Sequence, residues 1–178
     1  MRRRFLAALS AAAGLVLLLP AAPAQALPGT GPHTITVDHS GKCLGLERDS
    51  ADDWVRLVTA TCDGSAQQRF TLAAAANVPN TYQFRTSYGK CLMLAPIDGR
   101  EVHQFRCMNS TNDAGYLMSY HPWPGEQIRF FRGVEFELHA FCWHVRNAWT
   151  GDGATVIPHQ CNNPGQGARN DTFHFHPA

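Results

Sequence analysis

The sequence predicts an all-β fold built from three copies of a four-stranded unit. The first reason is that its six cysteines recur in pairs at a nearly constant period. The second is that short stretches of alternating apolar and polar residues are separated by clusters of glycine, asparagine, aspartate and proline, a pattern typical of strands joined by turns. One such unit is too small to bury a core. We therefore expect the copies to close on each other, which also removes exposed strand edges.

The cysteine pairs define the repeat. Residues 41–44 read G-K-C-L, residues 89–92 read the same, and a looser third copy, F-C-W-H, occupies residues 141–144. The opening cysteines follow one another after 48 and 51 residues, a period typical of a repeated supersecondary unit. A second cysteine follows each opening one after 19, 16 and 19 residues. The repeat therefore selects one disulfide in each copy: Cys43–Cys62, Cys91–Cys107 and Cys142–Cys161.

Alternation with a period of two predicts half-buried strands at residues 34–37, 82–85 and 134–138. Aligning the copies predicts four strands in each, twelve in all, with the third strand of each copy running into its second cysteine. The fourth strand ends on an aromatic residue in every copy: Phe70, Phe130 and Phe173. We expect these three phenylalanines to occupy equivalent buried positions.

This alignment places the repeats at about residues 32–73, 80–132 and 133–178. The second copy carries an insertion, residues 108–126, that is rich in aromatic residues and contains two prolines. A loop of this length is either functional or packed on itself.

The first 26 residues predict a secretory signal peptide. A basic run at residues 2–4 precedes an apolar stretch at residues 5–19, and the A-x-A pattern at residues 24–26 is typical of a cleavage site. The apolar stretch is shorter than the roughly 20 residues that a membrane span needs, although an uncleaved anchor is the alternative. We expect a secreted, extracellular chain of residues 27–178 without a membrane span, a setting in which disulfides form.

Composition argues against several classes of function. The formal net charge is only +1 and no basic run follows residue 4, so we expect no nucleic-acid partner. No C-x-x-C pair, phosphate-binding loop or nucleophile-elbow motif occurs. We therefore expect no metal, no cofactor and no enzymatic activity, and a monomeric protein.

The G-K-C-L opening, the hydrophobic strand into the second cysteine and the Q-x-aromatic closure at residues 68–70 resemble the repeat of ricin B-chain type β-trefoil lectins. The resemblance covers residues from about 32 to 178. It implies a β-trefoil: a pseudo-threefold barrel with a hairpin cap, closing aromatics in the core, and one surface sugar pocket in each repeat. Phe70 stands where the family has tryptophan, and the other two copies lack the glutamine.

The resemblance also implies pocket residues. The family's carboxylate position, two residues after the first cysteine, is filled here by Gly45, Met93 and His144. The ring position, two residues before the second cysteine, is filled by Ala60, Phe105 and His159. The family's asparagine corresponds to Gln67 in the first copy and Asn170 in the third, and Asn109 is the candidate in the second.

The third copy keeps the most complete polar set, so we expect His144, His159 and Asn170 to surround one sugar, with Arg146 at the rim. Phe105 and Asn109 are the candidates in the second copy. The resemblance implies a secreted, non-enzymatic carbohydrate-binding protein whose partner is a glycan. The alternative is a trefoil with decayed sugar pockets that binds another secreted protein, as an inhibitor or toxin component does. A small hydrolase with an unfamiliar site is a third possibility.

Overall fold

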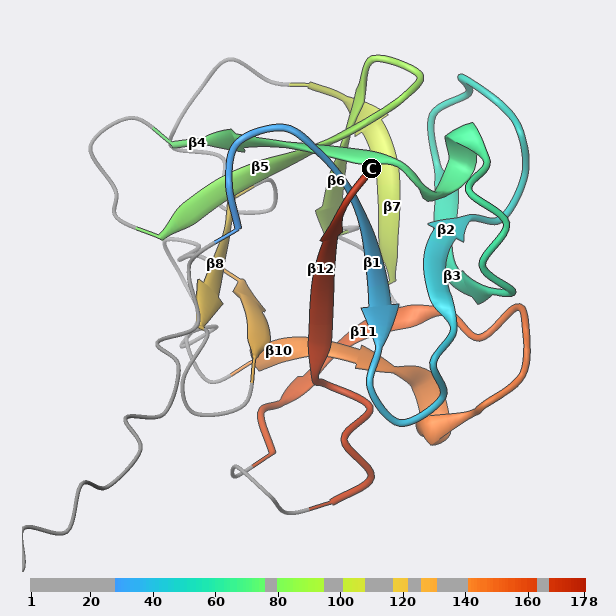
Figure 1. Ribbon diagram of the computed structural model, residues 1–178, viewed down its shortest axis with the longest axis vertical. Helices are drawn as coiled ribbons and strands as arrows, with labels where there is room; N and C mark the ends of the chain where they lie inside the picture. The colour runs from blue at the N-terminus through green and yellow to red at the C-terminus, as the bar shows by residue number, and fades with distance from the viewer. Residues whose placement is uncertain are drawn as a thin grey trace, which may run out of the picture.

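The computed structural model describes residues 28–75, 80–94, 101–107, 117–121, 126–130, 141–162 and 167–178, which form a twelve-stranded antiparallel sheet (Figure 1). The first four strands are β1 (Pro32–Val37), β2 (Cys43–Leu46), β3 (Val55–Ala60) and β4 (Phe70–Ala74). The next four are β5 (Thr81–Thr86), β6 (Lys90–Leu94), β7 (Val102–Arg106) and β8 (Leu117–His121). The last four are β9 (Gln127–Phe130), β10 (Phe141–Val145), β11 (Val156–Gln160) and β12 (Phe173–Pro177). Two 3₁₀ turns, η1 (Ala66–Gln68) and η3 (Arg146–Ala148), complete the described elements.

The outer strands of each group of four form a barrel. Antiparallel pairing joins β12 to β1, β1 to β4, β4 to β5, β5 to β8, and β8 to β9. The backbone N–H of Phe173 donates to the carbonyl of Glu126 at 3.0 Å, which brings the start of β12 beside the start of β9. This closure is the one expected for a trefoil, because it pairs strands that would otherwise be exposed edges.

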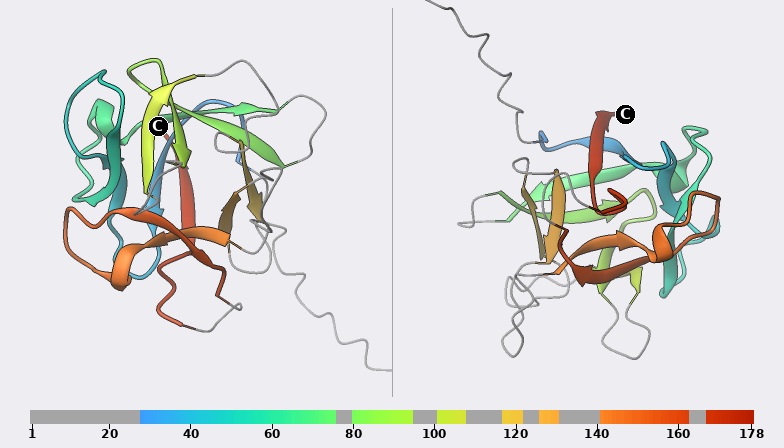
Figure 2. Two further views of the ribbon diagram at one scale, coloured as in Figure 1. Left: turned by 180° about the vertical axis from the view of Figure 1, so that it is seen from behind. Right: turned by 90° about the horizontal axis from the view of Figure 1, so that it is seen from below.

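The inner strands of each group form a hairpin, and the three hairpins are seen in teal, yellow-green and orange in Figure 2. Each hairpin is closed by the predicted disulfide: Cys43–Cys62, Cys91–Cys107 and Cys142–Cys161. The first residue of β2, the second of β6 and the second of β10 are the opening cysteines, so the disulfides sit at the same place in all three hairpins.

The tip of one hairpin docks on the next repeat through its backbone. The N–H of Trp54, at the tip of the first hairpin, donates to the carbonyl of Gln104 on β7 at 2.9 Å. The N–H of Gly153, at the tip of the third hairpin, donates to the carbonyl of Thr59 on β3 at 2.7 Å. The hairpin registers make Gln104 and Thr59 equivalent positions, so this is one contact made twice.

The lysines of the two G-K-C-L segments belong to the same docking contact. Lys90 Nζ lies 2.7 Å from Asp53 Oδ1, and Lys42 Nζ lies 2.9 Å from Asp152 Oδ1. Each aspartate directly precedes the docking tip residue described above. The repeated lysine therefore pairs with the tip of a neighbouring repeat rather than with a ligand.

The core is made by the inward faces of the barrel and the hairpins. Phe70 begins β4, Phe173 begins β12, and both are fully buried as predicted. Trp143 of β10 is also fully buried, with its ring centroid 6.2 Å from that of Phe173 and 5.2 Å from that of Phe84. Aromatic residues of several strands therefore meet in one cluster, which no single repeat could bury.

The predicted equivalence of Phe130 with Phe70 and Phe173 is wrong. In the strand pairs β4–β5, β12–β1 and β8–β9, the residues opposite Phe70, Phe173 and Met118 are Thr86, Val37 and Phe130. Fully buried Met118 on β8 thus takes the place of the closing aromatic, and Phe130 lies on the first strand of the next group. The pairing of β9 with β10 favours a third repeat that starts at Gln127 rather than at residue 133. The alignment failed because methionine replaced the aromatic residue that marks the closing strand.

The predicted strand at residues 134–138 lies outside the described residues. The predicted insertion, residues 108–126, contains β8 and is therefore in part a barrel strand rather than a loop. The rest of that segment, apart from Glu126, lies outside the described residues.

We predict that Phe173→Ala lowers the free energy of unfolding by about 3–5 kcal/mol, because it leaves a cavity in the aromatic cluster. Denaturant unfolding followed by circular dichroism measures the change. Phe175→Ala on the same strand is the matched control, because Phe175 is only half-buried and its truncation should cost less. Equal losses in the two variants would contradict the assignment of Phe173 to the core.

Candidate functional site

A cavity of about 310 Å³ opens on the third repeat. His144 of β10 and His159 of β11 line it together with Asn170, which lies shortly before β12. The structure therefore brings together the three residues that the sequence analysis placed around one sugar. It does so because β10 and β11 pair in a register that sets His159 opposite Cys142 and His144 opposite Ile157.

His144 forms the buried part of the cavity. Its side chain is almost fully buried, and its ring centroid lies 4.9 Å from that of His159. Burial lowers the pKa of His144 below its ordinary value of 6.5, and the carboxylate of Asp171, at 3.6 Å from Nε2, opposes that effect only in part. The imidazole is therefore neutral at pH 7. Its Nε2 is buried on the side of the ring that faces Asp171 and makes no hydrogen bond to any described residue.

His159 and Asn170 complete the set in different ways. His159 is exposed and presents its ring at the mouth of the cavity. Asn170 is buried, and its Nδ2 donates to the carbonyl of Val145 at 2.8 Å. Asn162, another lining residue, donates from its Nδ2 to Asn170 Oδ1 at 3.5 Å. The amide of Asn170 is thus held in one orientation by the strand beside it.

Asp171 is a site residue that the sequence analysis missed. Its Oδ2 accepts from the backbone N–H of Asn162 at 2.9 Å and from Gln127 Nε2 at 2.7 Å. In the first repeat Gln68 Oε1 accepts from the backbone N–H of Asp63 at 3.0 Å. Asp63 and Asn162 each follow the second cysteine of their repeat. Asp171 therefore accepts in the third repeat the same backbone hydrogen bond that Gln68 accepts in the first. The sequence signal for this role was that Asp171 lies two residues before Phe173, as Gln68 lies two residues before Phe70.

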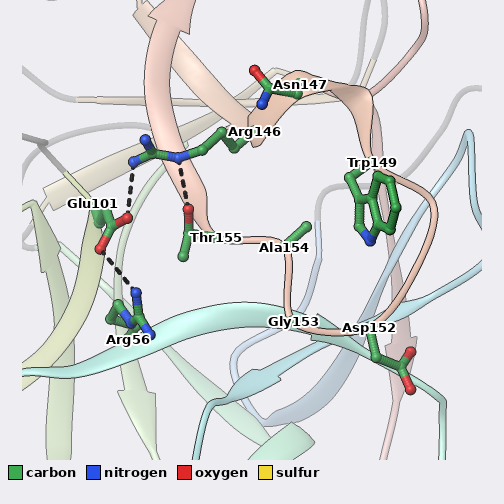
Figure 3. Close-up of a pocket in the computed structure, with 9 residues that line it drawn as sticks. All are labelled: Arg56, Glu101, Arg146, Asn147, Trp149, Asp152, Gly153, Ala154 and Thr155. Atoms are coloured by element: carbon green, nitrogen blue, oxygen red, sulfur yellow. Dashed lines mark hydrogen bonds and ion pairs between the residues drawn. The ribbon is translucent and has the colours of Figure 1, made fainter.

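Arg146, which was expected at the rim, points elsewhere. It follows β10 in the turn η3, and its Nη2 lies 2.8 Å from Glu101 Oε1 while its Nε donates to Thr155 Oγ1 at 2.9 Å (Figure 3). The turn reverses the chain at Asn147, which has a left-handed φ of 55°. The structure therefore places Arg146 on a second cavity and not with His144.

The place in the first repeat that corresponds to this cavity is occupied by a side chain of the same repeat, Gln68. Gly45 lies where His144 lies in the third repeat, and a Cβ atom there would be only 3.1 Å from Gln68 Cγ. Ala60 supplies no ring at the position of His159. The first repeat therefore offers neither the space nor the polar groups found in the third.

The corresponding place in the second repeat is covered by a residue of the first. Phe105 stands at the position of His159, and the ring centroid of Trp54 lies 4.5 Å from it. The guanidinium carbon of Arg106 lies 5.4 Å from the same ring centroid, and Met93 packs against the ring from its own strand pair. The ring of Phe105 is thus engaged within the protein. Asn109 lies outside the described residues.

The chemistry of the third cavity is that of a neutral polar site. Neutral imidazoles and amides both donate and accept hydrogen bonds, as the hydroxyl groups of a sugar do. Within the described ranges, no group of three or more histidine, cysteine, aspartate or glutamate side chains is arranged to hold a metal ion. The same part of the chain has no helix long and apolar enough to span a membrane.

Comparison with solved structures extends this picture. The designed threefold-symmetric protein ThreeFoil matches with a TM-score of 0.66 at 21% identity, over 82% of this chain and 97% of its own. The Rhizoctonia solani agglutinin matches with a TM-score of 0.67 at 16% identity, over 87% of this chain and 100% of its own. A ricin B-like lectin of Macrolepiota procera, solved in complex with lactose, matches with a TM-score of 0.60 at 15% identity, over 86% and 100%. Likenesses at these identities show a shared β-trefoil fold.

Comparison of sequences gives the family. No sequence of a curated protein matches the chain. The family model described as ricin-type β-trefoil lectin domain-like matches residues 25–114, just over half of the 178 residues. The chain therefore belongs to the family of ricin-type β-trefoil lectin domains.

Proposed function

We propose that this chain is a secreted, non-enzymatic carbohydrate-binding protein that holds one sugar unit in the cavity of its third repeat. The observation that carries the proposal is that His144, His159 and Asn170 line one open cavity, whereas the equivalent places in the first two repeats are filled. Membership of a lectin domain family supports the class of ligand.

In this proposal the lining residues of the cavity contact different parts of the sugar. The exposed ring of His159 lies against the apolar face of the sugar at the mouth. The neutral ring of His144 forms the base of the cavity, against which the sugar unit rests. The amides of Asn162 and Asn170 orient neighbouring hydroxyls, and their fixed positions reduce the entropy lost on binding.

The charge distribution around the cavity supports binding without hydrolysis. Glycoside hydrolysis uses a pair of carboxyl groups about 5–9.5 Å apart across the bond that breaks. The described lining residues of this cavity include no aspartate or glutamate. Asp171 lies behind His144, and its oxygens accept from Gln127 and Asn162, so its carboxylate stabilises the site rather than attacking a ligand.

Secretion is the second part of the proposal. Three disulfides fit an oxidising compartment. Residues 1–26 carry the basic, apolar and A-x-A pattern of a signal peptide, and cleavage after residue 26 would leave the trefoil as the secreted product. Mass spectrometry of the protein recovered from culture medium tests the cleavage point.

We predict that His159→Ala weakens glycan binding by roughly tenfold, because it removes the exposed ring at the mouth of the cavity. The measurement is a glycan array with residues 27–178, followed by calorimetric titration of the strongest neutral glycan. His176→Ala is the matched control, since His176 is also exposed but lines neither described cavity. No glycan signal from the wild-type protein would reject carbohydrate binding, and equal affinity in both variants would reject the third repeat as its place.

A second prediction concerns pH. Burial lowers the pKa of His144 in the folded protein, so the unfolded chain takes up this proton at a higher pH than the folded one. The contribution of the neutral imidazole to stability is therefore complete above about pH 6.5 and decreases as the pH falls toward the lower pKa of the folded state. The groups that face this ring are Asp171 and His159, and the latter adds repulsion when it is protonated.

Unfolding free energies of the wild type and of His144→Gln, measured between about pH 8 and pH 5, check this prediction. The wild type should lose more stability than the variant over this interval, because glutamine does not titrate. His176→Gln is the control for the loss of one histidine and should follow the wild type. Parallel curves for the wild type and His144→Gln would show that burial of His144 does not affect its protonation.

A further inference from the structure

A second cavity, of about 400 Å³, is lined by residues of all three hairpins (Figure 3). Arg56 of β3 and Glu101, which precedes β7, form one side, and residues 146–155 at the tip of the third hairpin form the other. Its volume is within the range of about 300–1,000 Å³ typical of small-molecule sites. We propose that it is a second sugar subsite, which takes a neutral unit of the same glycan chain; this inference rests on the carbohydrate binding proposed above.

Trp149 is the feature that suggests a sugar. Its side chain lines the cavity and is 61% exposed, although tryptophan is usually highly buried. The backbone beneath it is held, because its carbonyl accepts from His39 Nε2 at 3.2 Å and its N–H donates to the carbonyl of Arg146 at 3.2 Å. An ordered aromatic face at a cavity matches the flat apolar face of a sugar ring.

Gly151 makes room for this indole. A Cβ atom at Gly151 would lie 2.5 Å from Trp149 Nε1, a distance that no side chain can accept without moving the ring. The backbone of Gly151 does not adopt the left-handed conformation that favours glycine. Glycine is therefore required at this position by the space that the tryptophan ring occupies, and not by the backbone conformation. An alanine here would displace the ring without straining the backbone.

The polar groups of the cavity are fixed by ion pairs. Glu101 Oε1 lies 2.8 Å from Arg146 Nη2, and Glu101 Oε2 lies 3.9 Å from Arg56 Nη1. Arg56 is also bound through Nε and Nη2 by both carboxylate oxygens of Glu47. Such pairs orient guanidinium donors and carboxylate acceptors before a ligand arrives.

These ion pairs also indicate the charge of the ligand. The positive charge of Arg56 is balanced by Glu47 and that of Arg146 by Glu101, while Asp152 pairs with Lys42 on the rim. A cavity whose charges are balanced in pairs gives no net attraction to an anion. It offers both donors and acceptors, which suits the hydroxyl groups of a neutral sugar.

The two cavities adjoin at Asn147, which lines both. Asn147 and Ala148 have left-handed φ values of 55° and 49°, so the turn η3 separates the two spaces with a single short bend of the chain. A chain of two or more sugar units is thus the occupant that can reach both. The geometry points to a preference for oligosaccharides over monosaccharides.

The test compares array binding of neutral mono- and oligosaccharides built from galactose, glucose, mannose, N-acetylgalactosamine and N-acetylglucosamine. We expect Trp149→Ala and Gly151→Ala to bind oligosaccharides about tenfold more weakly while keeping the affinity for monosaccharides. Trp54→Phe is the matched control, because Trp54 is the other exposed tryptophan of the described residues and lines neither cavity, and phenylalanine keeps a ring over Phe105. Thermal unfolding of each variant checks that it is folded.

The outcomes separate the two proposals. Unchanged oligosaccharide affinity in Trp149→Ala and Gly151→Ala, with weaker binding by His159→Ala, would overturn the second subsite and leave the first in place. Loss of monosaccharide binding in Trp149→Ala would overturn the division into two subsites. Absence of any signal from the wild type would overturn carbohydrate binding at both.

Discussion

Docking of the first and third hairpin tips on neighbouring repeats is the contact on which the arrangement of the described repeats depends. A four-stranded repeat of about 45 residues cannot bury enough apolar surface to fold alone. The hydrogen bonds from Trp54 N–H to Gln104 and from Gly153 N–H to Thr59 join the repeats, and the pairs Asp53–Lys90 and Asp152–Lys42 lie beside them. The ion pairs are partly exposed, so each contributes at most about 1 kcal/mol. Burial of the aromatic cluster around Trp143 stabilises the closed barrel, and the docking contacts set which repeat meets which.

The same contact contributes to the difference between the surfaces of the first two repeats. At the second repeat the docking tip carries Trp54, with a left-handed φ of 67°, and its ring covers Phe105. The equivalent tip residue docked on the first repeat is Gly153, which has no side chain, and there the side chain of Gln68 occupies the space beside Gly45. At the corresponding place in the third repeat, the described residues line an open cavity. The corresponding places in the first two repeats are thus filled for two separate physical reasons.

Much of the fold could be predicted from the sequence, because equivalent positions in the three hairpins lie at the same number of residues from the paired cysteines. The disulfide pairs and the equivalence of Ala60, Phe105 and His159 follow from that counting, and the strand registers agree with it. The closing strand of the second repeat could not be found in this way. It lies outside the disulfide loop, and its marker residue is Met118 instead of an aromatic.

The residues that line the candidate site could be predicted from the sequence, but the contacts of neighbouring residues with other parts of the chain could not. His144 and His159 meet through the pairing of β10 with β11, and hydrogen bonds to Val145 hold Asn170 beside them. The direction of Arg146 follows its ion pair with Glu101, 45 residues away in the sequence, and its hydrogen bond to Thr155. Phe105 is covered by Trp54, which lies 51 positions away in the sequence. The role of Asp171 depends on a hydrogen bond from Asn162, which the sequence does not show.

The central claim is that the third repeat is the place where this protein holds a sugar. The most direct measurement is a set of ¹H–¹⁵N NMR spectra of residues 27–178 during titration with the strongest glycan found on the array. The account predicts that shifts concentrate at the imidazoles of His144 and His159 and at the backbone around Asn162 and Asn170. Shifts confined to Trp54 and Phe105, or to residues 108–126, would contradict it.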